Sequence, residues 1–64
     1  MTFEFDVGDI LATGEFSKPN LSALILDKNW DDDEGCVIYT IQHFVNGNTT
    51  PLLHDTVVAL AYED

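Results

Sequence analysis

The dipeptide Asn46-Gly47 is the sequence feature that most constrains the fold of this chain. It directly follows residues 36–45, which are rich in β-branched and aromatic side chains, and it precedes a shorter segment of strand-like composition at residues 50–53. Asn-Gly is the preferred composition of a two-residue turn whose central positions both need a positive φ. The sequence therefore predicts an antiparallel hairpin with a tight turn at Asn46-Gly47.

Three further segments have the composition of strands. Residues 21–30 predict a long strand, which an acidic tip at residues 31–35 joins to the strand at 36–45. Residues 10–13 predict a first strand followed by a longer loop at 15–20, and residues 57–62 predict a final strand after a single turn at 54–56. A helix over residues 55–62, capped by Asp55 or Thr56, is the alternative. Because this segment shows no amphipathic stripe, five strands are predicted.

The length of 64 residues allows one domain, which spans residues 1–64. A chain of this size buries only about 60% of the surface that its unfolded form exposes, so marginal stability is expected. The sequence holds a single cysteine, Cys36, and no Cys/His cluster that would bind zinc. Stability must therefore come from the hydrophobic core or from a partner.

Five short strands that are apolar on both faces predict a strongly bent antiparallel sheet that closes into a small barrel, since a flat sheet would leave one apolar face wet. The layout consists of Gly8-Asp9-Ile10-Leu11 at the first strand, a long loop, two long hairpin strands, the Asn46-Gly47 turn and a short turn before residues 57–62. Over nearly its whole length the chain thus resembles the SH3-like (Tudor/KOW-type) small barrels. It is also similar to small acidic accessory proteins of bacteriophages, which would make it a viral protein.

The formal net charge of −10 restricts the partners and the location that we expect. A surface of this sign repels nucleic acid and anionic lipid, so direct nucleic-acid binding and membrane binding are not expected. The first 25 residues lack the basic region and the apolar run of a secretory signal, and the longest apolar stretch, residues 23–26, is too short to cross a bilayer. A cytoplasmic protein is expected, in the host cell if the chain is viral, and one free cysteine fits a reducing compartment.

The most distinctive local feature is the acidic run Asp31-Asp32-Asp33-Glu34. The spacing of oxygen-bearing side chains from Asp27 onward begins like an EF-hand loop, but the glycine at its sixth position and the glutamate at its twelfth are missing. A specific calcium site is therefore not expected. The charge of the run instead favours encounter with a protein surface rich in Lys and Arg.

The spacing of the carboxylates suggests mimicry of DNA. Alternate residues of a strand lie on one face about 6.7 Å apart, so Asp31 with Asp33, or Glu4 with Asp6, would present carboxylates at a spacing comparable with that of DNA phosphates. The alternative is that the acidic residues only keep a small, apolar-rich barrel soluble and prevent pairing between sheet edges.

Two aromatic side chains are expected at the contact surface. Trp30 borders the acidic tip and Phe16 lies in the predicted long loop, so these two are the best candidates for exposure. With the charged tip they would form an apolar centre and a charged rim, as interaction hot spots do. Alternatively, Trp30 closes one end of the barrel. Tyr39 and Phe44 lie in predicted core strands and are expected to be buried.

Catalysis and metal binding are not expected. His54 and Asp55 are neighbours in the sequence, which does not by itself orient an imidazole, and Cys36 and His43 are seven residues apart on one predicted strand and so point to opposite faces. Cys36 is expected in the core, and a barrel this small is expected to have no substrate pocket. The sequence therefore predicts a protein that is not an enzyme and holds no cofactor.

Together these features predict an acidic protein-binding module, an inhibitor or regulator that docks on a basic protein surface in the manner of a DNA mimic. The alternative is a self-associating structural or accessory subunit that forms a homodimer through an exposed strand edge. In that case the acidic residues only keep the protein soluble. The predicted partner-binding residues are Trp30, Asp31, Asp32, Asp33, Glu34 and Phe16.

Overall fold

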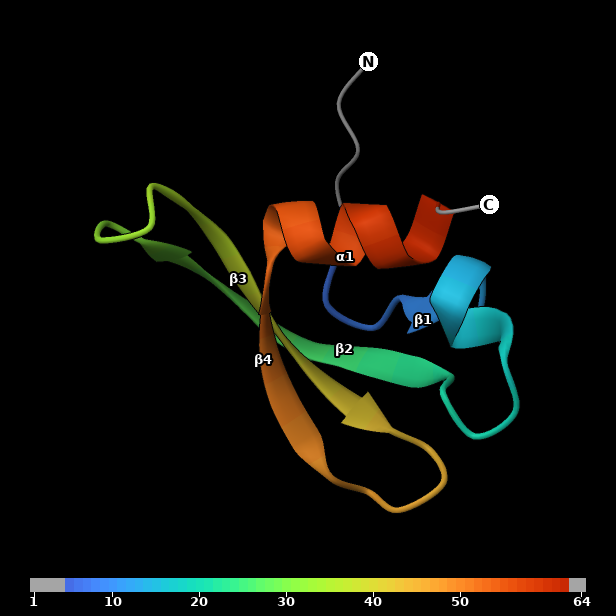
Figure 1. Ribbon diagram of the computed structural model, residues 1–64. Helices are drawn as coiled ribbons and strands as arrows, with labels where there is room; N and C mark the ends of the chain where they lie inside the picture. Colours follow the sequence, from blue (N-terminus) through green and yellow to red (C-terminus); the bar gives the residue numbers. More distant parts are fainter. Residues whose placement is uncertain (1–4, 63–64) are drawn as a thin grey trace.

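An antiparallel sheet of four strands and one helix make up the computed structural model, which describes residues 5–62 (Figure 1). The strands lie in the order β1-β2-β3-β4, and each pairs with its neighbour along the chain. The prediction of a small, mostly β protein is confirmed. The elements are β1 (Ile10–Leu11), the 3-10 helix η1 (Gly14–Ser17), β2 (Ala23–Asp31), β3 (Cys36–His43), β4 (Thr49–Leu53) and α1 (His54–Tyr62).

The prediction of a fifth strand at residues 57–62 is wrong, because this segment belongs to α1. The helix does have an apolar face: Val57 and Ala61, one turn apart, are buried, and Val58 and Leu60 pack against the core. Every residue from 57 to 62 is apolar, so the composition hides this periodicity and fits a buried strand equally well. Asp55 in the first turn is favourable at the positive end of the helix dipole.

The sheet is a curled half-barrel that α1 covers on its concave side (Figure 1). Within the described residues β1 and β4 do not pair, so the predicted closure into a five-stranded barrel does not occur. No helix of the described chain is long and apolar enough to span a membrane.

A β-bulge in β2 determines which side chains share the concave face. Ile25 pairs with Ile41, but the next pair joins Asp27 to Thr40, so one extra residue is inserted on the β2 side. Such an insertion bends the strand and reverses the alternation of its side chains. Beyond the bulge it is therefore Trp30, opposite Val37, that lies on the side of the sheet that α1 covers.

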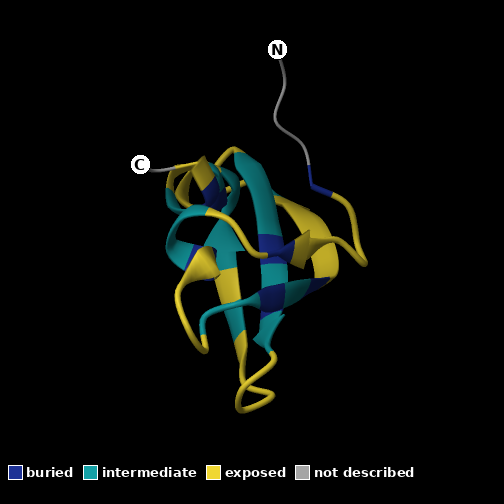
Figure 2. Cartoon of the chain, turned by 90° about the vertical axis from the view of Figure 1, so that its right-hand side faces the viewer, coloured by how far each residue is buried: buried dark blue, intermediate teal, exposed yellow. Residues whose placement is uncertain are grey.

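The core lies between the concave face of the sheet, η1 and α1. Tyr39 lies near its centre and is 2% exposed, which confirms the prediction that this ring is buried. Figure 2 shows the buried segments inside the molecule and the exposed ones at the turns. The buried side chains are Phe5, Leu11, Phe16, Ala23, Ile25, Tyr39, Ile41, Val57 and Ala61.

The hairpin at Asn46-Gly47 is confirmed, but its predicted two-residue turn is wrong. The connection runs over residues 44–48 and is closed by hydrogen bonds from Gly47 N to His43 O (2.8 Å) and from His43 N to Asn48 O (3.0 Å). Gly47 has a positive φ of 71°, whereas Asn46 does not. Phe44 therefore lies in the turn and is 57% exposed, so the prediction that it is buried is also wrong.

Candidate functional site

The β2–β3 hairpin extends beyond the rest of the sheet. Among described residues, the last backbone hydrogen bonds of β2 to the N-terminal segment are made by Ile25, and β4 ends at Leu53, opposite Ile38. Past these points the two strands pair only with each other as far as Asp31 and Cys36. They form a two-stranded ribbon that projects from the body of the molecule (Figure 1).

Side-chain and backbone hydrogen bonds shape the acidic turn at the end of the ribbon. Asp31 Oδ1 accepts from the backbone N–H groups of Asp33 (2.9 Å) and Glu34 (3.3 Å), and Asp31 O accepts from Gly35 N at 2.8 Å. Gly35 supplies the positive φ, 68°, that this turn needs. Asp31 is half-buried, and the next three carboxylates, those of Asp32, Asp33 and Glu34, are exposed.

The strand-like spacing predicted for the carboxylates is not observed. Asp31 is the last residue of β2, and Asp33 lies in the turn, so the two do not alternate along one extended strand. The second predicted pair includes Glu4, which lies outside the described residues. The charge of the tip is therefore concentrated at a turn and does not extend along a strand.

Trp30 is the apolar part of this site. Its side chain is 64% exposed, so it does not close an end of a barrel, and its predicted exposure is confirmed. The indole Nε1 donates a 2.7 Å hydrogen bond to Asp32 Oδ1, which ties the ring to the acidic turn. Trp30 and the exposed carboxylates thus form one continuous surface, here called the tip surface: Trp30, Asp31, Asp32, Asp33 and Glu34.

Phe16 does not belong to the tip surface, and its predicted exposure is wrong. It is 3% exposed and lies in the core, because η1 turns the segment inward against α1. Gly14, at the start of η1, approaches the helix so closely that a Cβ atom there would lie 2.6 Å from Ala61 O. The contact between η1 and α1 could not be predicted from the sequence, because a single 3-10 turn has no periodic pattern of apolar residues.

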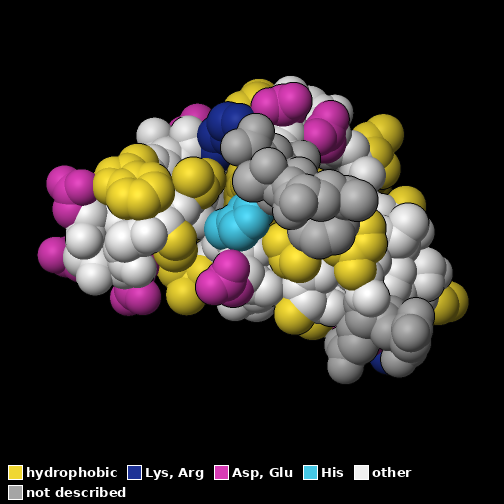
Figure 3. Space-filling model, turned by 90° about the horizontal axis from the view of Figure 1, so that it is seen from above, with side chains coloured by type: hydrophobic (Ala, Val, Ile, Leu, Met, Phe, Trp, Pro, Cys, Tyr) yellow, Lys and Arg dark blue, Asp and Glu magenta, His cyan; other side chains and the backbone are white. Residues whose placement is uncertain are grey.

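Ion pairs bring Lys18 and Lys28 to carboxylates outside the tip surface. Lys18 Nζ lies 2.7 Å from Glu15 Oε2, and Lys28 Nζ lies 3.1 Å from Asp6 Oδ1. Neither pair includes a carboxylate of the tip surface. Figure 3 shows a hydrophobic cluster near one end of the molecule with Asp and Glu side chains at its outer margin.

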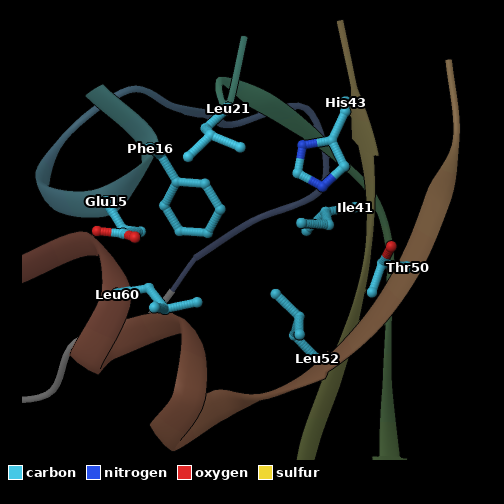
Figure 4. A pocket seen from close by; sticks show the side chains of 8 residues that line it. All are labelled: Glu15, Phe16, Leu21, Ile41, His43, Thr50, Leu52 and Leu60. Atoms are coloured by element: carbon cyan, nitrogen blue, oxygen red, sulfur yellow. The ribbon is translucent and has the colours of Figure 1, made fainter. Parts of the chain in front are cut away.

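A cavity of about 290 Å³ lies between β3, β4, η1 and α1, where sequence reasoning expected no pocket. The open side of the half-barrel explains it, since no fifth strand fills this space. His43 is one of its lining residues, and the Nδ1 atom of this imidazole is buried without a hydrogen-bond partner among residues 5–62. The lining residues, drawn in Figure 4, are Glu15, Phe16, Leu21, Ile41, His43, Thr50, Leu52 and Leu60.

The residues considered for catalysis are not brought together. His54 Nδ1 lies 2.9 Å from the Tyr39 hydroxyl, and neighbouring Asp55 is exposed. Cys36 and His43 stand at opposite ends of β3, and Cys36 is half-buried, not part of the core cluster. Within residues 5–62 no group of three or more His, Cys, Asp or Glu side chains is placed to hold a metal ion.

No family model, no curated protein and no solved structure matches this chain.

Proposed function

We propose that the protein is a non-enzymatic binding module whose tip surface docks on a basic protein surface, and that it acts there as an inhibitor or regulator. The observation that carries the proposal is the exposed indole of Trp30, hydrogen-bonded to Asp32 at the end of a projecting acidic ribbon. This arrangement supports docking because a fixed aromatic ring loses little conformational freedom on binding.

Electrostatics determine the chemical class of the partner. Four of the twelve acidic residues follow one another at the end of the β2–β3 ribbon, so negative charge is concentrated where this ribbon projects from the molecule (Figure 1). A potential of this kind accelerates encounter with Lys- and Arg-rich surfaces and slows encounter with other acidic ones. Rim carboxylates contribute mainly to the association rate, whereas Trp30 contributes buried contact area and slows dissociation.

A basic surface of this kind also attracts the phosphates of nucleic acid, so the tip surface would compete with DNA or RNA for it. The carboxylates of the tip surface do not have the strand-like spacing of DNA phosphates. In this proposal they take the place of phosphates as a compact cluster of negative charge at a turn. DNA mimicry thus remains part of the proposal in the sense of shared charge, and the SH3-like resemblance and a viral origin remain proposals as well.

The proposal is tested by capture from native cell extract and titration of the captured, purified protein. Affinity should fall steeply between about 50 and 200 mM salt, and duplex DNA should compete if the partner binds nucleic acid. Trp30→Ala should weaken binding by about tenfold or more. The triple variant Asp32→Asn, Asp33→Asn, Glu34→Gln should weaken it and flatten its salt dependence.

Matched control variants separate the tip surface from general charge and apolarity. Phe44→Ala removes an aromatic side chain of similar exposure from the opposite hairpin. The triple variant Asp9→Asn, Asp27→Asn, Asp55→Asn changes the net charge by the same amount as the test variant. If the controls weaken binding as much as the test variants, the tip surface is not the docking site.

Self-association is the second candidate, and the outer edge of β2 favours it. Within the described chain, residues 26–31 of β2 have no strand partner on that side, whereas β4 carries Pro51, which lacks an N–H group and disfavours pairing at the other edge. Capture of further copies of the chain, unchanged or strengthened by salt, would support this candidate and contradict docking on a basic partner.

A further inference from the structure

We propose that Asn46 is a site of spontaneous deamidation and that the folded turn at residues 44–48 controls the rate of this modification. The inference goes beyond docking at the tip surface, because the turn lies at the opposite end of β3 from that surface (Figure 1). Three observations carry it: the glycine that follows Asn46, the hydrogen bond that occupies the attacking nitrogen, and the Gln42 side chain that holds Gly47 in place.

Among the four asparagines of the chain, Asn46 is followed by the residue that best permits the reaction. All four are exposed, so exposure does not distinguish them. Deamidation begins when the backbone nitrogen of the next residue approaches the side-chain amide carbon, and Gly47 has no side chain to hinder that approach. The other three, Asn20, Asn29 and Asn48, are followed by leucine, tryptophan and threonine. The sequence therefore favours Asn46 alone.

The reaction at Asn46 needs only the chain itself and water. Hydroxide removes the amide proton of Gly47, whose nitrogen then attacks Cγ of Asn46 and closes a succinimide ring. The bond from Cγ to Nδ2 breaks, and the departing nitrogen takes up a proton from water, which releases ammonia and regenerates hydroxide. Water then opens the ring at either carbonyl and leaves an aspartyl or an isoaspartyl linkage. The product carries one more carboxylate than the original chain, whose formal net charge is −10.

In the folded protein the attacking nitrogen is already in use. Gly47 N donates to His43 O at 2.8 Å, and Gln42 Nε2 donates to Gly47 O at 3.0 Å. These bonds fix Gly47 at both its N–H group and its carbonyl. Because the N–H group must leave His43 O before it can react, the turn has to open first, and local opening of this kind carries its own free-energy cost.

The side chain of Asn46 is bound in a way that does not protect it. Its Oδ1 accepts a hydrogen bond from Asn48 N at 2.9 Å. Such a bond withdraws electron density from the amide carbon, and this makes Cγ more open to attack by a nucleophile. The protection therefore comes from the bonds that hold Gly47, so these bonds determine the rate.

Deamidation at Asn46 also has a structural consequence. An isoaspartyl linkage adds one methylene group to the main chain between His43 and Asn48, whose 3.0 Å hydrogen bond from His43 N to Asn48 O closes the connection. The longer connection no longer matches this bond, and a chain of this size has little stability to lose. We therefore expect the isoaspartyl form to melt at a lower temperature than the original chain.

Peptide mapping by mass spectrometry, after incubation of the full chain at neutral pH, tests the proposal. Native protein is compared with protein unfolded in urea at the same pH. We expect modification at Asn46 only, about tenfold or more faster in the unfolded chain. Equal rates in the two states would overturn control by the turn. Equal modification of the other three asparagines would overturn the assignment of the site.

A variant at Gln42 tests the restraint on Gly47. Gln42→Ala should accelerate deamidation of the native protein about threefold or more, because the Gly47 carbonyl loses its side-chain partner. Thr40→Ala, two residues earlier on the same face of β3, is the matched control and should leave the rate unchanged. An unchanged rate in Gln42→Ala would contradict the restraint.

Hydrogen exchange of the Gly47 amide gives a measurement that needs no variant. Protection of this amide is expected in the original chain, because its N–H group is bonded to His43 O. Exchange as fast as in the urea-unfolded chain would mean that the turn does not restrain the attacking nitrogen, and the proposal would be wrong.

Discussion

The hydroxyl group of Tyr39 connects three distant parts of the chain. It lies 2.9 Å from Nδ1 of His54 at the start of α1, and Phe5 N donates to it at 3.5 Å. The Phe5 ring packs edge-on against Tyr39 with 5.6 Å between ring centroids. Because the tyrosine is buried, this small network fixes the N-terminal segment and the helix start against β3.

Tyr39→Phe should therefore destabilise the protein although it removes a single atom. We expect a loss of about 1 to 2 kcal/mol in the free energy of unfolding, measured by urea denaturation, because the partners lose a buried hydroxyl. A double-mutant cycle with His54→Ala isolates the shared hydrogen bond and should give a coupling of about 1 kcal/mol. Strictly additive effects would mean that the two residues stabilise the fold independently.

Individual side chains also show where sequence reasoning fails at this scale. The sequence predicts that Phe16 is exposed and that Phe44 is buried, and the structure shows the opposite for both residues. Each assignment depended on whether the residue lies in a strand or in a connection. Phe44 is exposed because the turn spans residues 44–48, and Phe16 is buried because η1 lies where the sequence predicts an open loop. For Trp30 the sequence leaves two placements open, exposure beside the acidic tip or closure of a barrel end, and its exposed fraction of 64% agrees with the first.

At the scale of elements, the fold depends on the contact between η1 and α1. Gly14 has a positive φ of 57°, and its missing side chain leaves room for the carbonyl groups of Leu60 and Ala61. The contact places Phe16 in the core and forms one wall of the cavity. A side chain at Gly14 would meet backbone, which cannot move aside as a flexible side chain can.

Gly14→Ala should thus cost far more stability than a backbone preference alone explains. We expect a loss of about 3 kcal/mol or more in the free energy of unfolding, combining left-handed strain with displacement of α1. Gly35→Ala is the matched control, because Gly35 has a positive φ of 68° and nothing lies within 4 Å of a Cβ there. Its loss should be about 1 kcal/mol. Equal losses for the two variants would argue against a close contact between η1 and α1.

The elements differ in how strongly the sequence specifies them. The β2–β3 hairpin was predictable, since two long runs of strand-forming residues flank an acidic segment ending in Gly35. The bulge at residues 25–27 was not, because no glycine marks it and it depends on how β2 pairs with β3. Residues 57–62 could not be assigned from the sequence for a different reason. All six side chains are apolar, so their pattern fits a helix and a strand equally well, and packing against the curled sheet determines which one forms.

At the scale of the whole molecule, a small core is combined with a high net charge. Nine described residues form the buried cluster, whereas the formal net charge is −10. Marginal stability stays a prediction, and the size and charge from which it follows are properties of the sequence. The open side of the half-barrel and its cavity did require them, because they follow from α1 taking the place of a closing strand.

Added salt should stabilise this protein, because screening weakens repulsion among its carboxylates. We expect the free energy of unfolding to rise by roughly 1 kcal/mol between low salt and about 0.5 M NaCl, measured by urea denaturation. Asp33→Asn with Glu34→Gln should raise stability at low salt and lose this advantage at high salt, since neither side chain accepts a hydrogen bond that shapes the turn. Sodium sulfate at matched ionic strength distinguishes screening from salting-out, which strengthens apolar burial in every variant alike. Stability that falls with added NaCl would mean that attraction to Lys18 and Lys28 outweighs the repulsion among the carboxylates.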